Sequence, residues 1–253
     1  MAENWLRRIA RFAFGRVLPQ EIAYPVLRGP LKGCRFYLGA GAGEGGGATV
    51  YFNLSEPEQT QAFANTVRPG QVLFDIGANI GYYTILGSKL VSGNGAVFAF
   101  EPAVRNIAYL YRHVLLNEAE NVTIVPGACS DSLSISQFSL GQNWALGHLV
   151  ENGSLQAETS GRVSIVPTMT VDEFVECTGT SPDVMKIDVE GAERRVLQGA
   201  RDTLLAMSPT IFLSVHSADL RRSCFDFLKE LNYTCEALNG NAQNGTEFLV
   251  RKV

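Results

Sequence analysis

The chain has 253 residues, of which 46% are hydrophobic and 18% charged, and its formal net charge is −4. This length allows one large α/β domain or a smaller domain with an appendage. The slight acidity gives no reason to expect a nucleic-acid partner, which favours a basic surface. No apolar run approaches the roughly 20 residues that span a bilayer, and the five cysteines form no Cys-x-x-Cys pair. Reduced cysteines and a cytoplasmic location are therefore expected.

Residues 1–70 are expected to form an accessory region, and its first helix has two interpretations. Over residues 5–18, apolar residues recur at helical spacing among four arginines. Such a basic helix can lie on an anionic membrane surface, here the inner membrane face. It can instead pack on the domain or on a second subunit of a homo-oligomer. The second interpretation is favoured, because most amphipathic helices face a core.

Three further features are expected before residue 70. A strand is expected at Leu31–Leu38. The glycine-rich segment Gly39–Gly47 lacks the lysine and hydroxyl of a phosphate-binding loop, so it is interpreted as a linker or a lid. Ser55 is expected to cap a helix that runs to about Val67, because a hydroxyl precedes a proline and acidic residues.

From residue 71 onward, short apolar runs alternate with helical segments. The predicted strands are 72–76, 96–100, 122–125, 184–187, 210–215, 233–238 and 246–250, and the predicted helices are 80–90, 103–117, 170–176, 191–206 and 218–231. This alternation predicts a mostly parallel, doubly wound α/β sheet over residues 71–253. The last two strands are joined by turn residues and should pair as an antiparallel hairpin at the sheet edge. Residues 132–165 are expected to form a hairpin and a mobile loop, which could cover a substrate or be a featureless surface loop.

The most informative stretch runs from Val72 to Gly81, where an apolar strand ends in Asp75 and the chain then bends through Gly77. A strand, a glycine turn and a helix together make a nucleotide-sized site at the carboxyl edge of a parallel sheet. The spacing lacks the three glycines of the dinucleotide fingerprint. It therefore favours S-adenosylmethionine over a nicotinamide or flavin cofactor, and the acid suits a cationic amino-acid tail.

The ends of the next two strands complete the predicted cofactor site. Glu101 follows the glycine turn by about twenty residues, where an acid typically holds ribose hydroxyls. Small residues after the third strand would admit an adenine ring, and Asp131 could contact its amino group or make a turn. The predicted cofactor-binding residues are Asp75, Gly77, Ala78, Asn79, Gly81, Glu101, Pro102 and Ala128.

Four polar residues are the catalytic candidates. Strand alternation places Lys186 and Asp188 on one side of the fourth strand. Lys186 could stabilise an alkoxide or neutralise Asp188, and Asp188 could hold the substrate hydroxyl or the amino group of the cofactor. Glu190 could orient either residue or cap the following helix. His216 follows the fifth strand, and its ordinary pKa near 6.5 suits a base. A solvated ion-pair cluster is the structural alternative. Asp188, Glu190 and His216 could bind Mg²⁺, but their spacing does not demand it and no metal is predicted.

The chain resembles the FkbM family of S-adenosylmethionine-dependent methyltransferases over about residues 50–235. The resemblance is carried by Asp75–Thr84, Phe100-Glu101-Pro102 and the more specific block Met185–Glu193. It implies a class I methyltransferase fold, which is Rossmann-like, and O-methylation, often of a sugar hydroxyl in a glycan or natural product. The family usually carries an acidic residue two places before the histidine, where this chain has Ser214.

These observations predict an S-adenosylmethionine-dependent O-methyltransferase acting on a hydroxyl of a sugar, glycolipid or natural product. The expected partner is a small-molecule or glycan acceptor whose identity the loops do not encode. A nicotinamide-dependent oxidoreductase and a non-catalytic methyltransferase-like binding protein are the alternatives. RNA methylation is disfavoured, because no basic stripe or aromatic platform stands out.

Overall fold

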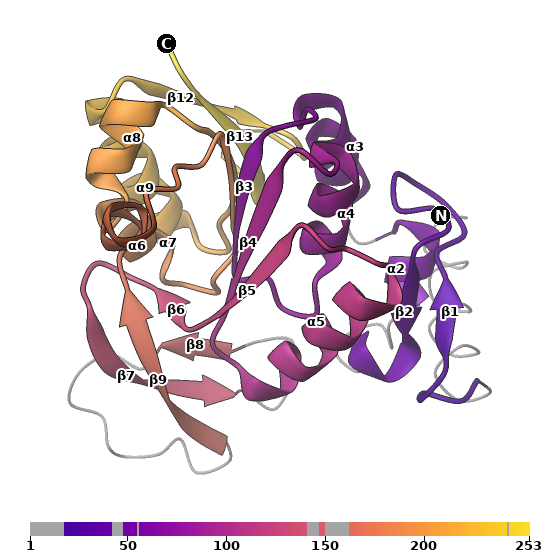
Figure 1. Cartoon of the computed structure of the whole chain (residues 1–253). Coiled ribbons are helices and arrows are strands. Elements are labelled where there is room, and N and C mark those ends of the chain that lie inside the picture. The colour runs from indigo at the N-terminus through magenta and orange to yellow at the C-terminus, as the bar shows by residue number, and fades with distance from the viewer. Residues whose placement is uncertain (1–17, 42–47, 55, 141–146, 150–161, 242) are drawn as a thin grey trace.

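A computed structural model describes residues 18–41, 48–54, 56–140, 147–149, 162–241 and 243–253 (Figure 1). The strands are β1 Ala23–Pro25, β2 Arg35–Tyr37, β3 Val72–Ile76, β4 Ala96–Glu101, β5 Val122–Pro126, β6 Ala128–Cys129, β7 Ser134–Leu140, β8 Gly147–Leu149, β9 Arg162–Met169, β10 Val184–Ile187, β11 Thr210–Ser214, β12 Tyr233–Ala237 and β13 Glu247–Lys252. The helices are the 3₁₀ turn η1 Leu38–Gly41, α2 Ala48–Phe52, α3 Pro57–Thr66, α4 Tyr82–Val91, α5 Val104–Leu116, α6 Val171–Thr178, α7 Glu193–Gln198, α8 Arg201–Met207 and α9 Ala218–Glu230.

A seven-stranded sheet in the order β12-β13-β11-β10-β3-β4-β5 forms the centre of the molecule. Its neighbouring strands from β11 through β5 are parallel, which confirms the predicted doubly wound α/β architecture. β13 runs antiparallel to both β11 and β12, so the predicted final hairpin is present. β13 is inserted beside β11, and β12 becomes the edge strand.

One face of this sheet is apolar along the full length of its strands. Phe74, Met185, Ile187, Ile211 and Leu213 alternate onto this face and belong to one buried cluster. Helices α6 to α9, drawn in orange tones, cover this side (Figure 1). Burial of these side chains fixes the strand register, because a slip by one residue would turn each of them to the opposite face.

The opposite face changes character along the strands. Near the amino ends of β3 and β10, Leu73 and Val184 pack with residues of α3 and α4 in a second buried cluster, which Phe212 of β11 also joins. Toward the carboxyl ends, the same face carries Asp75 and Lys186, which are paired in register across β3 and β10. The alternation therefore delivers polar side chains to one edge of the sheet while the apolar residues on the other face hold the strands in place.

The described part of the accessory region shares this second cluster, through residues such as Phe36, Tyr51 and Phe63. The predicted strand at 31–38 is reduced to β2, because a turn closes around Gly33 before it. The N-cap of α3 is Glu56 rather than the expected Ser55, which lies outside the described residues, as do 42–47. The predicted helix at 5–18 also lies outside them, apart from Leu18. The division at residue 70 stays a prediction.

One sequence prediction needs correction and another is incomplete. The helix expected at 191–206 is two helices, α7 and α8, and the break between them includes Gly199, which packs against the backbone of Ser130. A Cβ at Gly199 would lie 2.0 Å from that carbonyl oxygen. The hairpin predicted in 132–165 is present as the antiparallel pair β7 and β8. These strands and β9 also belong to a second, four-stranded sheet in the order β6-β9-β7-β8, which was not predicted. None of the described helices is long and apolar enough to cross a membrane.

Candidate active site

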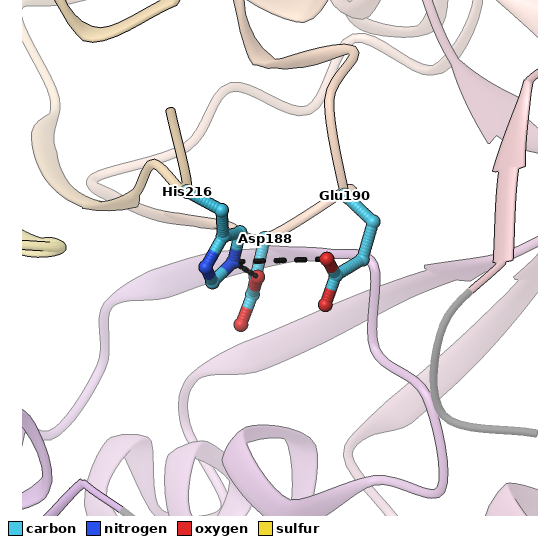
Figure 2. A group of neighbouring side chains, drawn as sticks. All are labelled: Asp188, Glu190 and His216. Carbon is cyan, nitrogen blue, oxygen red and sulfur yellow. Dashed lines mark hydrogen bonds and ion pairs between the residues drawn. The ribbon is translucent and has the colours of Figure 1, made fainter. Parts of the chain in front are cut away.

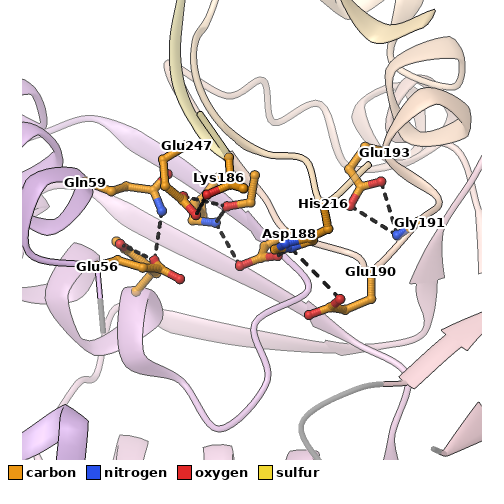
Figure 3. A network of polar contacts seen from close by, with 12 residues as sticks. Glu56, Gln59, Lys186, Asp188, Glu190, Gly191, Glu193, His216 and Glu247 are labelled. Carbon is orange, nitrogen blue, oxygen red and sulfur yellow. Dashed lines mark hydrogen bonds and ion pairs between the residues drawn. The ribbon is translucent and has the colours of Figure 1, made fainter. Parts of the chain in front are cut away.

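The polar edge of the sheet is organised around Lys186 (Figure 3). Its side chain is 1% exposed, although it ends in a charged ammonium. The Nζ donates to Ser214 Oγ at 2.8 Å and to Asp188 Oδ2 at 3.2 Å, and it lies 5.1 Å from the centroid of the Tyr83 ring. A buried ammonium this close to a carboxylate compensates the negative charge of that carboxylate. Of the two roles predicted for Lys186, the structure is consistent with neutralisation of Asp188.

Asp188, Glu190 and His216 lie together just beyond the ends of β10 and β11 (Figure 2). The Nε2 of His216 lies 3.3 Å from Asp188 Oδ1 and 3.9 Å from Glu190 Oε2. The side chain of His216 is 43% exposed and that of Asp188 is 26% exposed, so this group borders solvent. The buried Lys186 contacts it through Asp188. Glu190 does not cap a helix. The N-cap of α7 is Ala192, and Glu190 faces His216 instead.

The charges of these groups are strongly linked. Burial opposes ionisation of Asp188, but Lys186 and His216 outweigh it and lower the pKa of that carboxyl to about 2. The hydrogen bond to Asp188 raises the pKa of His216 to about 9, against the effect of burial, with Glu190 and Glu193 contributing. Burial lowers the pKa of Lys186, but Asp188, Glu56 and Glu247 together raise it above its usual value. At neutral pH, Lys186 and His216 are therefore both cations facing an ionised Asp188.

Two carboxylates near Lys186 escaped the sequence reasoning. Glu247, the first residue of β13, lies at this edge because its strand runs opposite to the others, and it accepts a hydrogen bond from Ser214 Oγ at 2.9 Å. Burial, with the charge of Glu56 adding to it, raises the pKa of Glu247 to about 7. Glu56 accepts from Tyr83 and from Gln59, both at 2.8 Å. The predicted antiparallel hairpin was the signal that could have placed Glu247 here.

The glycine turn touches this group directly. Gly77 has φ +84, and a Cβ there would lie 1.9 Å from the carbonyl oxygen of Asp188. The amides of Gly77 and Ala78 both donate to Phe100 O, at 3.0 and 2.9 Å. Gly81 also has a positive φ, of +95, and a Cβ there would meet Leu110 at 2.6 Å. The turn between β3 and α4 is thus packed tightly against both neighbouring strand ends.

Glu101 lies behind the turn and retains capacity for a ligand. It is 4% exposed, and its Oε1 accepts from the Ala103 amide and from Asn106, while Oε2 accepts from the Asn79 amide at 2.8 Å. A carboxylate oxygen can accept two hydrogen bonds, so Oε2 can take another. The nearby buried Asn106 Oδ1 has no partner among the described residues. Two acceptor atoms with unused hydrogen-bonding capacity are thus present beside the glycine turn.

The remaining cofactor candidates differ in accessibility. Asp75 is 2% exposed and accepts from Thr84 Oγ1 at 2.5 Å, and burial raises its pKa to about 6. Because Asp75 is buried and already accepts a hydrogen bond from Thr84, its predicted contact with a cationic tail stays a prediction. Ala128 is buried in β6, whereas Pro102 and Asn79 are partly exposed. Asp131 pairs with Arg195 at 2.9 Å, which occupies the carboxylate predicted either to contact adenine or to make a turn.

The group of Asp188, Glu190 and His216 could also hold a metal ion. One ligand atom from each of Asp188, Glu190 and His216 lies within 4.8 Å of the others. Carboxylate and imidazole ligands suit several divalent metals. The Lys186 ammonium, 3.2 Å from Asp188 Oδ2, already neutralises one of these ligands and would repel a second cation. No metal was predicted from the sequence, and chelation decides whether the site needs one.

A family model described as the methyltransferase FkbM domain matches residues 75–238 of this chain. The chain belongs to the FkbM methyltransferase family. The match begins at Asp75 in β3 and includes Glu101, Lys186, Asp188, Glu190 and His216. The fold of this FkbM-family methyltransferase is accordingly of class I, with the mostly parallel sheet described above.

Two curated relatives and one solved structure illustrate the similarity. The hexuronic acid methyltransferase AglP of Haloferax volcanii is 28% identical over 166 residues, which cover 65% of this chain and 64% of that protein. The 31-O-demethyl-FK506 methyltransferase FkbM of Streptomyces tacrolimicus is 29% identical over 178 residues, covering 60% and 68%. A crystal structure of a methyltransferase FkbM from Methylobacillus flagellatus KT aligns with a TM-score of 0.48 at 16% identity, covering 81% and 53%.

Proposed function

We propose that this methyltransferase uses S-adenosylmethionine to methylate a hydroxyl of a sugar, glycolipid or natural product. The observation that carries the proposal is the Asp188–His216 pair, which lies at the carboxyl edge of the sheet directly against the glycine turn. An alcohol is a poor nucleophile while protonated, so a transferase for hydroxyls benefits from a positioned base. The site offers that base beside the place where the cofactor would bind.

The charges of the site also suit a cationic cofactor. Two basic groups, Lys186 and His216, are surrounded by six carboxyl groups, which belong to Glu56, Asp75, Asp188, Glu190, Glu193 and Glu247. S-Adenosylmethionine carries a sulfonium and an amino-acid ammonium, and it supplies an electrophilic methyl group when bound. Glu101 would hold its ribose through Oε2, and the turn from Gly77 to Gly81 would surround its amino-acid end. The other cofactor-binding residues predicted from the sequence are part of the same proposal.

His216 would act through its Nδ1 atom. The ionised Asp188 carboxylate can only accept hydrogen bonds, so the neutral ring keeps its hydrogen on Nε2 and carries its lone pair on Nδ1. The acceptor oxygen bonds to the methyl carbon as the carbon–sulfur bond breaks, and the hydroxyl proton passes to Nδ1. A pKa of about 9 leaves His216 mostly protonated at neutral pH. A cation bound nearby lowers that pKa and so promotes the neutral ring.

The names of the relatives suggest which hydroxyls to try first. One relative is named for a hexuronic acid and the other for 31-O-demethyl-FK506. The experiment combines calorimetry with S-adenosylmethionine and NAD⁺, and detection of S-adenosylhomocysteine after incubation with a methyl glucuronide, a methyl glucoside and a macrolide bearing a free hydroxyl. Binding of S-adenosylmethionine and methylation of one hydroxyl is the expected result. Binding of NAD⁺ alone would favour an oxidoreductase, and cofactor binding without turnover on any acceptor would favour a binding protein.

A further inference from the structure

Lys186 is a buried cation with few acceptors around it. An ammonium carries three hydrogens and cannot accept a hydrogen bond. Among the described residues, its hydrogen-bond acceptors are Asp188 Oδ2 and Ser214 Oγ, and the Tyr83 ring lies on a further side. An unsatisfied buried charge is costly. The position of Nζ relative to Asp188 therefore depends on the Ser214 hydroxyl.

The chemistry of the partners fixes the direction of the hydrogen bonds through Ser214. Lys186 only donates, and Glu247 only accepts once it is ionised, which requires a pH above its pKa of about 7. In that state the one hydroxyl hydrogen of Ser214 points to Glu247 Oε2, 2.9 Å away, which leaves the lone pairs of Ser214 free for Lys186. The chain of donation runs from Lys186 through Ser214 to Glu247. All three side chains are buried, at 1%, 0% and 5% exposure.

The fold holds Glu247 firmly in this arrangement. Ser214 and Glu247 are directly paired across the antiparallel strands β11 and β13. The amides of Thr246 and Glu247 both donate to Asn239 Oδ1, at 2.9 and 3.0 Å, so the hairpin fixes the start of β13. The backbone of Val215 also donates to Thr246 O at 2.8 Å. Glu247 is consequently presented to Ser214 by two independent sets of backbone contacts.

We propose that Glu247 is a positioning residue of the methyl-transfer site, which acts through Ser214 to hold the Lys186 ammonium against Asp188. This inference rests on the proposed function for its consequence in turnover, but the contacts themselves can be tested without an acceptor. Within the described part of the chain, Glu247 forms hydrogen bonds with Ser214, Thr246 and Asn239 and none with the glycine turn or His216. Its effect should therefore appear in the rate of methyl transfer and not in cofactor affinity.

The first experiment follows the lysine ammonium groups by ¹H–¹⁵N NMR in the full-length protein. The chain has five lysines, and a buried, hydrogen-bonded ammonium exchanges its protons slowly while exposed ones exchange fast. A protected Lys186 signal, assigned as the one missing in Lys186→Met, is expected in the wild type. It should disappear in Glu247→Gln and in Ser214→Ala, and persist in Glu236→Gln, which makes the same change at an exposed position on β12. A signal that persists in Glu247→Gln would overturn the proposal, whatever Ser214→Ala shows.

The second experiment exchanges the paired residues. Because Ser214 and Glu247 face each other in register, Ser214→Glu combined with Glu247→Ser keeps the total side-chain volume and moves the carboxylate onto β11. With an acceptor found as above, Glu247→Ser and Glu247→Gln should each lower kcat about tenfold or more, with the Kd for S-adenosylmethionine and the KM for the acceptor within about threefold. The double variant should recover kcat to within about threefold of wild type.

Three outcomes of this second experiment would contradict the positioning role. They are an unchanged kcat in Glu247→Gln, an equal loss of cofactor affinity, and a folded double variant that recovers neither kcat nor the Lys186 signal. Should no acceptor be methylated by the wild type, the proposed function fails, while the NMR experiment still decides whether Glu247 holds Lys186. The two failures are therefore distinguishable.

Discussion

The carbonyl oxygen of Asp188 lies where a side chain at Gly77 would begin, since a Cβ there would be 1.9 Å from it. The turn that is predicted to bind the cofactor and the loop that carries Asp188 are therefore in backbone contact. Whatever moves one of them moves the other. This coupling makes Gly77 a position where one methyl group should disturb both cofactor binding and chemistry.

Gly77→Ala is expected to weaken S-adenosylmethionine binding and to abolish turnover together. The variant adds a clash to the cost of a positive φ, which alone is about 1–2 kcal/mol. Gly70→Ala is the matched control, since Gly70 has φ +85 but nothing within 4 Å of its Cβ position. Thermal unfolding and calorimetry of the two variants separate the contributions. Equal behaviour of both variants would show that the contact with Asp188 is unimportant.

His216→Ala is expected to retain cofactor affinity and to lose about 10²–10⁴-fold in kcat, because the proton of the acceptor hydroxyl then has no base. Among the described residues, the hydrogen bond and ion pairs of His216 are with Asp188 and Glu190 and not with the predicted cofactor residues. Calorimetry and the S-adenosylhomocysteine assay measure the two quantities. Substitution of His113, which is buried between Ile80 and Tyr37, should lower stability instead. Unchanged turnover in His216→Ala would remove this residue from the mechanism.

The pH dependence of kcat/KM should report the ionisation of His216 in the free enzyme. The base must be neutral to act, and its pKa is raised to about 9, so kcat/KM should rise with pH below about 9 and level off above it. Asp188→Asn removes the charge and hydrogen bond that raise this pKa. The midpoint of the profile should then move down toward about 6.5, with a lower plateau. A profile that is flat between pH 6 and 9 in the wild type would contradict a histidine base.

Glu101→Gln should weaken S-adenosylmethionine binding about tenfold or more, because an ionised acceptor for the ribose hydroxyls is lost. Glu101 also receives the Asn79 and Ala103 amides, so the unfolding midpoint should fall as well. Asn106→Ala provides a comparison, because it removes one hydrogen bond to Glu101 and leaves the carboxylate in place. A dissociation constant that is the same in Glu101→Gln and wild type would refute the ribose assignment.

Treatment with EDTA should leave methyl transfer unchanged, since Lys186 already provides the positive charge beside Asp188. Addition of Mg²⁺ or Mn²⁺ should raise the rate by less than about twofold by the same electrostatic reasoning. The measurement is the initial rate with and without chelator, together with Mn²⁺ binding by electron paramagnetic resonance. Loss of activity in EDTA, restored by Mn²⁺ and accompanied by Mn²⁺ binding that Glu190→Gln abolishes, would establish a metal site instead.

The sequence predicted the parts of the site that follow from strand alternation. Lys186 and Asp188 were placed on one side of their strand because residues two apart share a face, and His216 was placed nearby because neighbouring parallel strands end at the same edge. All three lie in contact as expected. The seven strands of the main sheet were also found, since buried strands bounded by turn residues have a strong periodic signal.

The parts that escaped prediction depend on contacts between distant segments. Glu247 is embedded in an apolar strand, and only its antiparallel pairing with β11 turns it toward Ser214. Glu56 belongs to the accessory region, 130 positions before Lys186 in the chain. Gly199 breaks a helix because of the backbone of Ser130, which no local pattern reveals. In each case tertiary packing decides what a local propensity leaves undetermined.

The reversed direction of β13 has a practical consequence for anyone who shortens this protein. The conserved-domain match stops at residue 238, before the strand that carries Glu247 begins. A fragment trimmed to that boundary would keep the glycine turn, Lys186, Asp188 and His216. It would nevertheless lose Glu247, the last acceptor in the hydrogen-bond chain that starts at Lys186. It would also leave β11 as an unpaired sheet edge that is prone to self-association.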